Sequence, residues 1–534
     1  MKKIILFFVL STYAFIPFLA SACDEYLQEK PETTLLKTYL SGGKAGEKIA
    51  GDLLTYLFDN VSAEELRSII VPLLKDSKLT EKLGAWATAD LLLKSHAVKE
   101  KILREGHIPY HTTFVGAGYK NLATLARLKN KWGDKVFKEK VSYQNEVLVV
   151  EQGEIVASPF YGRHFRLNSV FFDSEKRDVN YTASLLFQIS DTIKNDAYPY
   201  SHDVGVITAL NYRYLNVPIL FQSEVVGLKK PQYPWVAPYQ LKIQNEESNF
   251  HFLTKKIVYT PGTGVRSYSP YFPEGTKLLL RQSQARPKLA VGDLLDGNTF
   301  LKKIYAMPRE ELNEFLKDKS IAIAGLGHEG MTVIEAITTK VHEHYGIDKI
   351  PEGLRVVVYD NWQVKDFNDY LIKAQTGKSE HPPFREWIKK RYEILDFARL
   401  RGEVEGAPKQ LYFAKTKIRD VMLGDDGLLM PGHVAGQYGP ELYDVVVLCS
   451  GFEMKSAITN ELWQHYVSQT LNMESVMDGY KRVNILSQND DIYLSINRWN
   501  DPKLTATTEY PIPESFSVIG KSGELFADTL YPNR

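Results

Sequence analysis

A glycine-rich turn at residues 116–121 is the first place in this 534-residue chain where residue types and spacing could do chemistry. Gly116 permits a tight turn, and Gly118 lets backbone N–H groups approach a pyrophosphate at the positive end of the following helix. Asn121 occupies the third small position of the G-x-G-x-x-G pattern, so we expect looser packing of that helix on its strand. The turn predicts a dinucleotide site, and a chance glycine turn is the alternative.

A second turn at residues 325–330 has all three glycines, which are Gly325, Gly327 and Gly330. The same physical reasoning predicts a second dinucleotide site, and a purely structural turn is the alternative. His328 lies inside this turn. It either narrows the approach of a phosphate, offers a proton or a hydrogen bond to the ligand, or is an exposed loop histidine.

An acidic residue follows each turn, at the end of the next apolar strand. Glu151 ends the run at residues 147–150, and Asp360 ends the run at residues 354–359. A carboxylate in this position accepts hydrogen bonds from ribose hydroxyls. Asp360 favours NADH because a carboxylate repels the 2′-phosphate of NADPH, but Lys365 is close enough to leave both nucleotides open.

The elements around the two turns have the order that such sites require. Strand-like apolar runs at residues 112–115 and 320–324 precede the turns, and helix-like runs at residues 122–128 and 331–337 follow them. Residues 24 to about 110 show apolar residues at helical spacing and few strand-like runs. The alternation of strands and helices from Thr112 onward is typical of an α/β protein, and the length allows two or three domains.

The composition excludes several classes of function. The 65 basic and 65 acidic side chains give a formal charge of zero, so no global field favours nucleic acid or an anionic membrane. The 2 cysteines, Cys23 and Cys449, exclude a disulfide framework, a Cys-rich zinc site, an iron–sulfur cluster and a Cys-x-x-Cys redox pair. His202 and Asp203 suit acid–base chemistry, but no third residue at a metal or hydrolase spacing accompanies them. The sequence therefore predicts no metal and assigns no catalytic residue.

Residues 1–22 are typical of a secretory signal peptide. Two lysines precede an apolar run that ends in the small-residue stretch Ala20-Ser21-Ala22. The run is interrupted by polar residues and a proline and is shorter than the about 20 residues of a spanning helix. Cleavage would leave Cys23 as the first residue, and residues 19–23 also resemble a bacterial lipoprotein box. We expect an exported protein, either periplasmic or anchored through a lipidated Cys23, and a retained N-terminal anchor is the alternative.

Four further segments give the chain a resemblance to flavoproteins with two dinucleotide-binding domains. This class includes flavin-containing and N-hydroxylating monooxygenases and pyridine-nucleotide reductases. The resemblance covers about residues 111–530 and rests, beyond the two turns, on residues 219–226, 256–264, 444–453 and 516–520. The last segment resembles a C-terminal strand that returns to the flavin, and its Gly520-Lys521 is closer to the monooxygenase branch than the Gly-Asp of many reductases.

The resemblance implies two cofactors, FAD and either NADH or NADPH. It places FAD on residues of the first half, with the Val225 segment at the adenine and the C-terminal segment at the flavin: Gly116, Gly118, Asn121, Glu151, Val225 and Gly520. It places the nicotinamide nucleotide on the second turn and its acid: Gly325, Gly327, Gly330 and Asp360. Because the chain has no active-site dithiol, the disulfide-reductase branch is excluded.

The expected fold class is α/β, with two Rossmann-like three-layer dinucleotide-binding domains and a helical N-terminal extension. The expected divisions are a signal peptide at residues 1–22, a helical region at 23–110, the first part of an FAD-binding domain at 111–317, an NAD(P)-binding domain at 318–455, and a C-terminal return to the FAD domain at 456–534.

The function implied by the resemblance is that of an exported FAD-dependent oxidoreductase, which uses NAD(P)H and acts in a monooxygenase-like way on an unknown small molecule. Two alternatives stay open. One is a reductase that passes electrons to a quinone or carrier, and the other is a non-catalytic nucleotide-binding protein. The expected partner is a small-molecule substrate or electron acceptor and not a nucleic acid, and a lipidated Cys23 would add attachment to a membrane.

Overall fold

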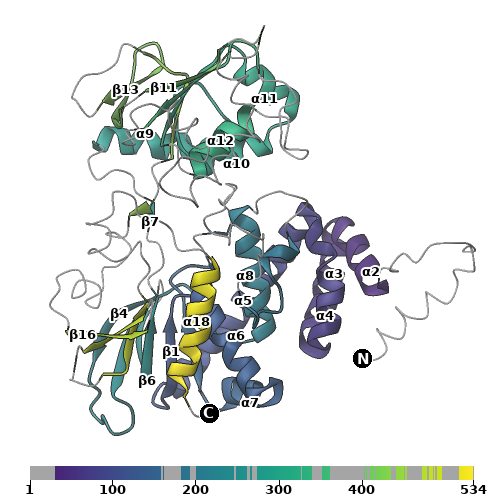
Figure 1. The fold of residues 1–534 in the computed structure, drawn as a ribbon, viewed down its shortest axis with the longest axis vertical. Coiled ribbons are helices and arrows are strands. Elements are labelled where there is room, and N and C mark those ends of the chain that lie inside the picture. Colours follow the sequence, from purple (N-terminus) through teal and green to yellow (C-terminus); the bar gives the residue numbers. More distant parts are fainter. Residues whose placement is uncertain are drawn as a thin grey trace, which may run out of the picture.

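The chain forms a helical N-terminal region and two α/β units, each built on a largely parallel sheet (Figure 1). The computed structural model describes residues 30–157, 160–161, 182–192, 200–245, 248–260, 265–266, 273–325, 328–338, 351–360, 402, 405, 409–414, 416–433, 441–449, 452–453, 472–477, 480–484, 486, 490–495 and 516–532. The predicted α/β class with a helical extension is confirmed. None of the described helices has the length and apolar character that a membrane span requires.

The N-terminal region is helical, as the sequence predicts. Its elements are α2 (Pro31–Ser41), α3 (Gly43–Asn60), α4 (Ala63–Ile70), the 3₁₀ turn η2 (Leu73–Lys75) and α5 (Ser77–Glu105). Side-chain caps fix where two of these helices begin, since Ser62 accepts the N–H of Glu65 and Asp76 accepts the N–H of Lys78. Apolar side chains at helical spacing bury one face of each helix.

The first sheet collects strands from distant parts of the chain. Its parallel core has the order β18-β6-β1-β2-β3, made of β1 (Tyr110–Val115), β2 (Val147–Val150), β3 (Ile219–Leu220), β6 (Asn249–Tyr259) and β18 (Ile492–Ser495). The antiparallel strands β17 (Tyr480–Asn484) and β16 (Asn472–Met477) extend it beyond β18. All of β2 is buried, which is typical of a central parallel strand covered on both faces.

Three layers make up the first unit. One face of the sheet, including Phe114 and Val149, packs with the helices α6 (Tyr119–Trp132), α7 (Asp134–Tyr143) and α8 (Ser201–Leu215). The other face, including Leu148 and Val150, packs with the antiparallel strands β4 (Ser223–Lys229) and β5 (Tyr239–Asn245) and the start of β6. The alternation of side chains along β1 and β2 thus divides the core into two compartments.

The second unit is a smaller sheet whose strands are all parallel. Its order is β11-β10-β9-β14-β8, made of β8 (Asp293–Asp296), β9 (Ser320–Ala324), β10 (Arg355–Tyr359), β11 (Leu411–Ala414) and β14 (Val445–Leu448). One face packs with α10 (Gly297–Ala306), α11 (Arg309–Leu316) and α12 (His328–Thr338). The other packs with α9 (Glu274–Ala285) and the hairpin of β12 (Ile418–Leu423) and β13 (Leu429–His433). The short strands β7 (Val265–Arg266) and β15 (Phe452–Glu453) form a separate antiparallel pair.

The C-terminal segment is a helix, α18 (Phe516–Leu530), and the strand predicted for residues 516–520 is wrong. An apolar run as short as Phe516–Gly520 does not distinguish a strand from a buried helix by periodicity alone. The full segment decides, because Gly520, Gly523 and Phe526 are buried at spacings of three residues along one helical face. Gly520 is therefore an interior helical residue.

Helix α18 packs on α6 through a glycine and is anchored at its end by lysines. Thr124 Oγ1 of α6 donates to the carbonyl of Gly523 at 2.9 Å. Lys131 donates to the carbonyl of Tyr531 at 2.6 Å, which satisfies an acceptor just after the helix ends. Tyr480 of β17 stacks on Phe526 with ring centroids 3.8 Å apart, so the C-terminal strands and helix share the first core.

Helix α5 attaches the N-terminal region to α8. A Cβ added at Gly84 of α5 would lie 2.5 Å from Val206 Cγ2, so the two helices touch at a glycine. Further along α8, the fully buried Arg213 pairs with Asp59 at 2.8 Å and with Asp90 at 2.5 Å. The side chain of Asp59 is 43% exposed and that of Asp90 is 14% exposed, so Asp90 is the more buried partner of the arginine. The helical region and α8 are therefore strongly coupled.

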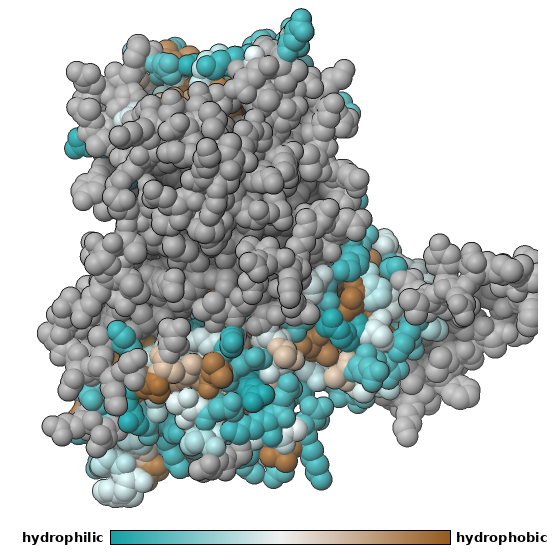
Figure 2. All heavy atoms as spheres, in the orientation of Figure 1, coloured by the Kyte–Doolittle hydropathy of each residue, from teal (hydrophilic) through white to brown (hydrophobic). Residues whose placement is uncertain are grey.

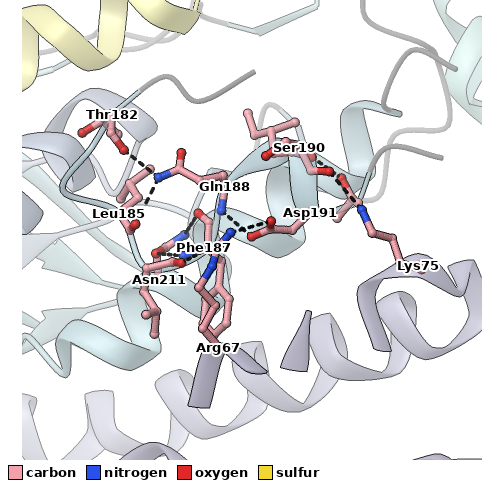
Figure 3. A network of polar contacts seen from close by, with 12 residues as sticks. Arg67, Lys75, Thr182, Leu185, Phe187, Gln188, Ser190, Asp191 and Asn211 are labelled. Atoms are coloured by element: carbon pink, nitrogen blue, oxygen red, sulfur yellow. Dashed lines mark hydrogen bonds and ion pairs between the residues drawn. The ribbon is translucent and has the colours of Figure 1, made fainter. Parts of the chain in front are cut away.

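A loop at residues 182–192, which includes the 3₁₀ turn η4 (Ile189–Asp191), adds a second connection (Figure 3). Arg67 of α4 donates to Asp191 Oδ1 at 2.8 Å. Asn211 of α8 accepts the N–H of Phe187 at 3.1 Å and donates to its carbonyl at 2.9 Å. On the face drawn in Figure 2, the described surface is mainly hydrophilic, with hydrophobic residues in small separate groups.

The contact between α18 and α6 predicts an unusual response to alanine. A Cβ at Gly523 would lie 2.5 Å from the carbonyl oxygen of Lys120 and 2.9 Å from Ala123 Cβ. We expect Gly523→Ala to lower the free energy of unfolding by about 1–3 kcal/mol, because the two helices must separate. Denaturant unfolding followed by circular dichroism measures this change.

Gly275 of α9 is the matched control, since a Cβ there would meet nothing within 4 Å. Gly275→Ala should be neutral or stabilising by up to about 1 kcal/mol, as is usual for glycine in a helix. Equal stability of the two variants would contradict the close contact at Gly523.

Candidate dinucleotide-binding sites

Gly116 makes the turn that follows β1, and its backbone conformation strongly favours glycine. Its φ angle is +97°, in the region that favours glycine. Its N–H donates to the carbonyl of Val150 at 2.8 Å. A Cβ at this position would lie 2.5 Å from the carbonyl oxygen of Thr260, the residue after β6. The turn is therefore confined between the ends of two neighbouring strands.

Both glycine turns lie where the strand order reverses direction. In the first sheet β1 lies between β2 and β6, and in the second sheet β9 lies between β10 and β14. The chain continues from β1 and from β9 to a neighbour on one side, and a later strand takes the other side. Such switch points leave a crevice at the carboxyl ends of the strands, where α/β proteins bind ligands.

Gly118 begins α6 and leaves its first turn open. It is the N-cap residue, with a φ angle of −87°, and as glycine it supplies no capping side chain. A Cβ added here would meet no atom within 4 Å. Tyr212 of α8 donates its hydroxyl to the carbonyl of Gly118 at 3.0 Å, which fixes the turn from behind. Backbone N–H groups at a helix start are suited to bind a phosphate.

Asn121 replaces the third glycine without loosening the helix. Its side chain is completely buried, and Nδ2 donates to the carbonyl of Gly116 at 2.7 Å. The hydrogen bond ties the first turn of α6 to the glycine turn, and Leu122 and Leu125 beside it are also fully buried. The expectation of looser packing at this position is wrong, because an amide can bond to the carbonyl that a third glycine would only approach.

Glu151 lies at the carboxyl end of β2, beside the glycine turn. Its Oε2 accepts the N–H of Ala117 at 2.6 Å, and its Oε1 accepts the N–H of Gly153 at 2.9 Å. Burial raises the pKa of Glu151, and these two backbone hydrogen bonds oppose the rise. Each carboxylate oxygen has a further lone pair, so ribose hydroxyls can still donate to Glu151.

Two residues of this site cannot be recognised from the sequence as site residues. Ala117 and Gly153 take part through backbone N–H groups, which any residue but proline would supply. Tyr212 is recognisable only once α8 is placed beside the turn. Burial, and next the negative charge of Glu151, raise the pKa of Tyr212 well above its usual value, so its hydroxyl stays a donor.

Val225 and Gly520 approach the first site from opposite layers. Val225 belongs to β4, which starts where the N–H of Ser223 donates to the carbonyl of Glu151 at 3.0 Å, and its side chain is buried in the core between the sheet and β5. Helix α18 runs parallel to α6, since Gly523 contacts Lys120 and Asp528 contacts the later Lys131. Gly520 therefore lies toward the end of α6 that carries the glycine turn.

The second turn repeats the geometry of the first. Gly325 has a φ angle of +101°, and its N–H donates to the carbonyl of Tyr359 at 2.8 Å. A Cβ at Gly330 would lie 2.1 Å from the carbonyl oxygen of Gly325, so α12 can pack on β9 only with glycine here. Gly327 and the side chain of His328 lie outside the described residues.

Asp360 stands in the position that Glu151 has in the first sheet. It directly follows Tyr359, which pairs with Ala324 across β10 and β9. The N–H of Asp360 donates to the carbonyl of Ala414 at 3.3 Å, which continues the pairing with β11. A carboxylate therefore ends the strand next to the one that carries Gly325, as a ribose contact requires.

A buried acid that the sequence analysis did not single out lies beside the second turn. Glu329, in the first turn of α12, is 8% exposed. A Cβ at Gly297 would lie 2.5 Å from Glu329 Cγ and 2.9 Å from Cys449 Sγ, so the starts of α10 and α12 and the end of β14 meet here. No three His, Cys, Asp or Glu side chains among the described residues are grouped to bind a metal ion.

His202 and Asp203 lie at the start of α8, and the contacts that they make there are structural. Asp203 Oδ2 accepts the N–H of Tyr200 at 3.2 Å and so caps the helix. His202 contacts the ring of Tyr161, and burial, with the positive charge of Lys302, lowers its pKa to about 4. The His202 imidazole is therefore neutral at physiological pH.

The fold is that of a two-unit α/β protein with a glycine turn at each switch point. No family model and no curated protein matches the chain. Similar solved structures include the ornithine N-hydroxylase of Kutzneria sp. 744 with reduced FAD and NADP⁺, at 12% identity and a TM-score of 0.46 over 79% of this chain and 99% of that one. The FAD-bound cadaverine monooxygenase of Erwinia amylovora is similar at 11% identity and a TM-score of 0.45 over 80% and 95%. The bacillithiol disulfide reductase of Bacillus cereus is similar at 14% identity and a TM-score of 0.42 over 79% and 98%.

The two glycines of the first turn predict effects of alanine on stability that differ in size. We expect Gly116→Ala to lower the free energy of unfolding by about 1–3 kcal/mol, through the strained φ angle and the contact with the Thr260 carbonyl. Gly118→Ala should change it by less than about 0.5 kcal/mol, because its φ angle is ordinary and the space is open. Thermal and denaturant unfolding of the two variants measure the difference, and an equal loss at both positions would show that the turn has another geometry.

Proposed function

We propose that the protein is an exported FAD-dependent oxidoreductase that uses NADH or NADPH and acts in a monooxygenase-like way on a small molecule. Each sheet has a glycine turn and an acidic residue together at its switch point, and the helix start of the first sheet is open at Gly118; this is the observation that carries the proposal. A single such site would suit many nucleotide-binding proteins. Two sites on separate sheets suit an enzyme that brings two dinucleotides together.

The first site fits the pyrophosphate and ribose of FAD. The start of α6 at Gly118 is open, and Glu151 retains acceptor capacity beside it. Bound there, FAD would supply the two-electron chemistry, and the chain would supply orientation and exclusion of water. Asn121 and Tyr212 would keep the turn in place, since both bond to its carbonyl groups.

The second site fits a nicotinamide nucleotide. Gly325 and Gly330 bring the start of α12 against β9, and Asp360 is placed for the ribose. The carboxylate of Asp360 favours the free 2′-hydroxyl of NADH, whereas Lys365, outside the described residues, keeps NADPH open.

The proposal covers two kinds of enzyme, which differ in the molecule that accepts the electrons. With 2 cysteines and no Cys-x-x-Cys pair, a dithiol is absent from the sequence, so electrons would pass to oxygen, to a quinone or carrier, or to a small organic molecule. Insertion of oxygen into the product separates the monooxygenase from the reductase. A non-catalytic nucleotide-binding protein is the remaining candidate, which the departures from the family pattern at Asn121 and Gly520-Lys521 allow.

The first test is spectroscopic. The purified protein, incubated with FAD and freed of excess, should show the absorbance of bound flavin, and NADH or NADPH added without oxygen should bleach it. A colourless protein that binds neither nucleotide would contradict the proposal. Bound flavin that neither nucleotide bleaches would favour the non-catalytic reading.

Gly118→Ala locates the flavin in the same experiment. We expect it to weaken FAD binding by about tenfold or more, which corresponds to about 1.4 kcal/mol, because a methyl group would enter the space left for the pyrophosphate. Its stability without FAD and its binding of the nicotinamide nucleotide should be unchanged. Gly275→Ala serves as the control with normal FAD affinity.

We also propose export, followed by lipidation of Cys23, on the pattern of residues 1–23. The basic residues before the apolar run are lysines rather than a twin arginine, so the chain would cross the membrane unfolded and acquire FAD afterwards. Expressed in a bacterium, the mature protein should begin at Cys23, carry the mass of a lipid and partition into detergent. Cys23→Ser should release it into the aqueous phase. A mature protein that retains residues 1–22 would contradict this proposal.

A further inference from the structure

The loop between β4 and β5 presents large apolar side chains to solvent. Trp235 is 78% exposed, Tyr233 is 53% exposed and Val236 is 39% exposed. The rings of Tyr233 and Trp235 contact each other at 5.2 Å between centroids, so they form one small surface. Single exposed apolar residues are common, but three on one short loop mark an interaction site.

The same loop is stiff. Pro231, Pro234 and Pro238 each fix a backbone φ angle, and the N–H of Val236 donates to the carbonyl of Tyr233 at 3.1 Å in a tight turn. A rigid loop loses little conformational entropy on binding. The loop therefore holds the aromatic residues in position before a partner binds.

The base of the loop is basic. Lys229 and Lys230 precede the aromatic residues and are exposed. Lys242 is exposed on the neighbouring strand and pairs with His251 of β6. Burial lowers the pKa of His251, and next the positive charges of Lys229 and Lys242 lower it further, because both lysines lie near the imidazole. Two acids lie next to the loop base: Asp490 is buried and accepts the hydroxyl of Tyr239, and Asp491 is paired with Arg482 at 2.9 Å.

The loop lies away from the two dinucleotide sites. At one end of the β4–β5 hairpin, Ser223 pairs with Asn245 and bonds to Glu151 of the first site. At the other end, Lys229 pairs with Gln240, six residues further along β4 and so about 20 Å away. In Figure 1 this end projects at the lower left, and in Figure 2 it forms a lobe of pale and brown residues.

We propose that this aromatic and basic loop, residues 229–242, docks the protein onto the surface of an anionic phospholipid bilayer. Tryptophan and tyrosine rings favour the interface between headgroups and acyl chains, where one edge is apolar and the other is wet. Lysines at the base of the loop would face the anionic headgroups. The attraction is local, so it is compatible with a chain of zero formal charge.

Charge favours a bilayer over a second copy of the chain as the occupant. In a symmetric dimer built on this loop, Lys229 and Lys230 of one copy would approach the same lysines of the other. That arrangement repels, whereas an anionic surface attracts all of these side chains. The docking would add to a lipid on Cys23 but does not depend on it, nor on the proposed oxidoreductase activity.

The test is cosedimentation of the full chain with vesicles of phosphatidylcholine alone and of equal parts phosphatidylcholine and phosphatidylglycerol. Every protein carries Cys23→Ser, so that no lipid is attached. We expect binding to the anionic vesicles that falls with added salt. The pair Lys229→Gln and Lys230→Gln should weaken it by about tenfold or more, since each lysine near such a surface contributes about fivefold.

The pair Tyr233→Ala and Trp235→Ala should weaken binding by about tenfold or more to both kinds of vesicle, because the interfacial contact is lost. Trp235→Phe should restore part of it. Tyr143→Ala, which removes an 80% exposed aromatic residue from α7, is the matched control and should bind as the parent does. All variants should keep the unfolding midpoint of the parent, because the side chains are exposed.

Three outcomes would overturn the proposal. One is undiminished binding by the loop variants, which would assign vesicle binding to residues 1–22. Another is the absence of binding by the parent chain. The third is a loop variant that changes the oligomeric state in sedimentation equilibrium and leaves vesicle binding intact, which would make the loop an interface between copies.

Discussion

The close approach of backbone at each glycine turn, between strand ends at Gly116 and between helix α12 and the turn at Gly330, is the constraint on which the rest of the structure depends. A Cβ at Gly116 would lie 2.5 Å from Thr260, and one at Gly330 would lie 2.1 Å from Gly325. Because no larger residue fits, strand, turn and helix can pack in only one arrangement at these points. That arrangement directs the start of α6 and the start of α12 toward a crevice and brings a carboxylate beside each turn.

The first unit is assembled around this constraint from segments far apart in the chain. The helices α6, α8 and α18 cover one face of its sheet, and the antiparallel strands β4 and β5 cover the other. Ion pairs of Arg213 connect the helical N-terminal region to α8. The hydroxyl of Tyr212, one residue before that arginine, bonds to the first glycine turn. The N-terminal region therefore stabilises the same helix that supports the candidate FAD site.

Sequence patterns predicted the local elements and missed what depends on tertiary contacts. The runs before both turns became β1 and β9, and the two acids directly follow β2 and β10, because strand, turn and helix signals are local. Residues 516–520 were misread as a strand, since their periodicity becomes clear only with the rest of α18. The bond from Asn121 to Gly116 and the hydroxyl of Tyr212 at Gly118 depend on side-chain direction and on a helix placed from elsewhere. Composition cannot reveal such partners.

The pairing of α18 with α6 has a consequence for the order of folding. The hydrogen bond between Thr124 and Gly523 joins residues 399 positions apart, and the complete second unit is encoded between them. Contacts between residues so far apart in the sequence form slowly, because the long chain segment between them must first close into a loop. The sheet of the second unit can form from residues 293–448, whereas the face of α6 under α18 stays uncovered until residue 523 has emerged.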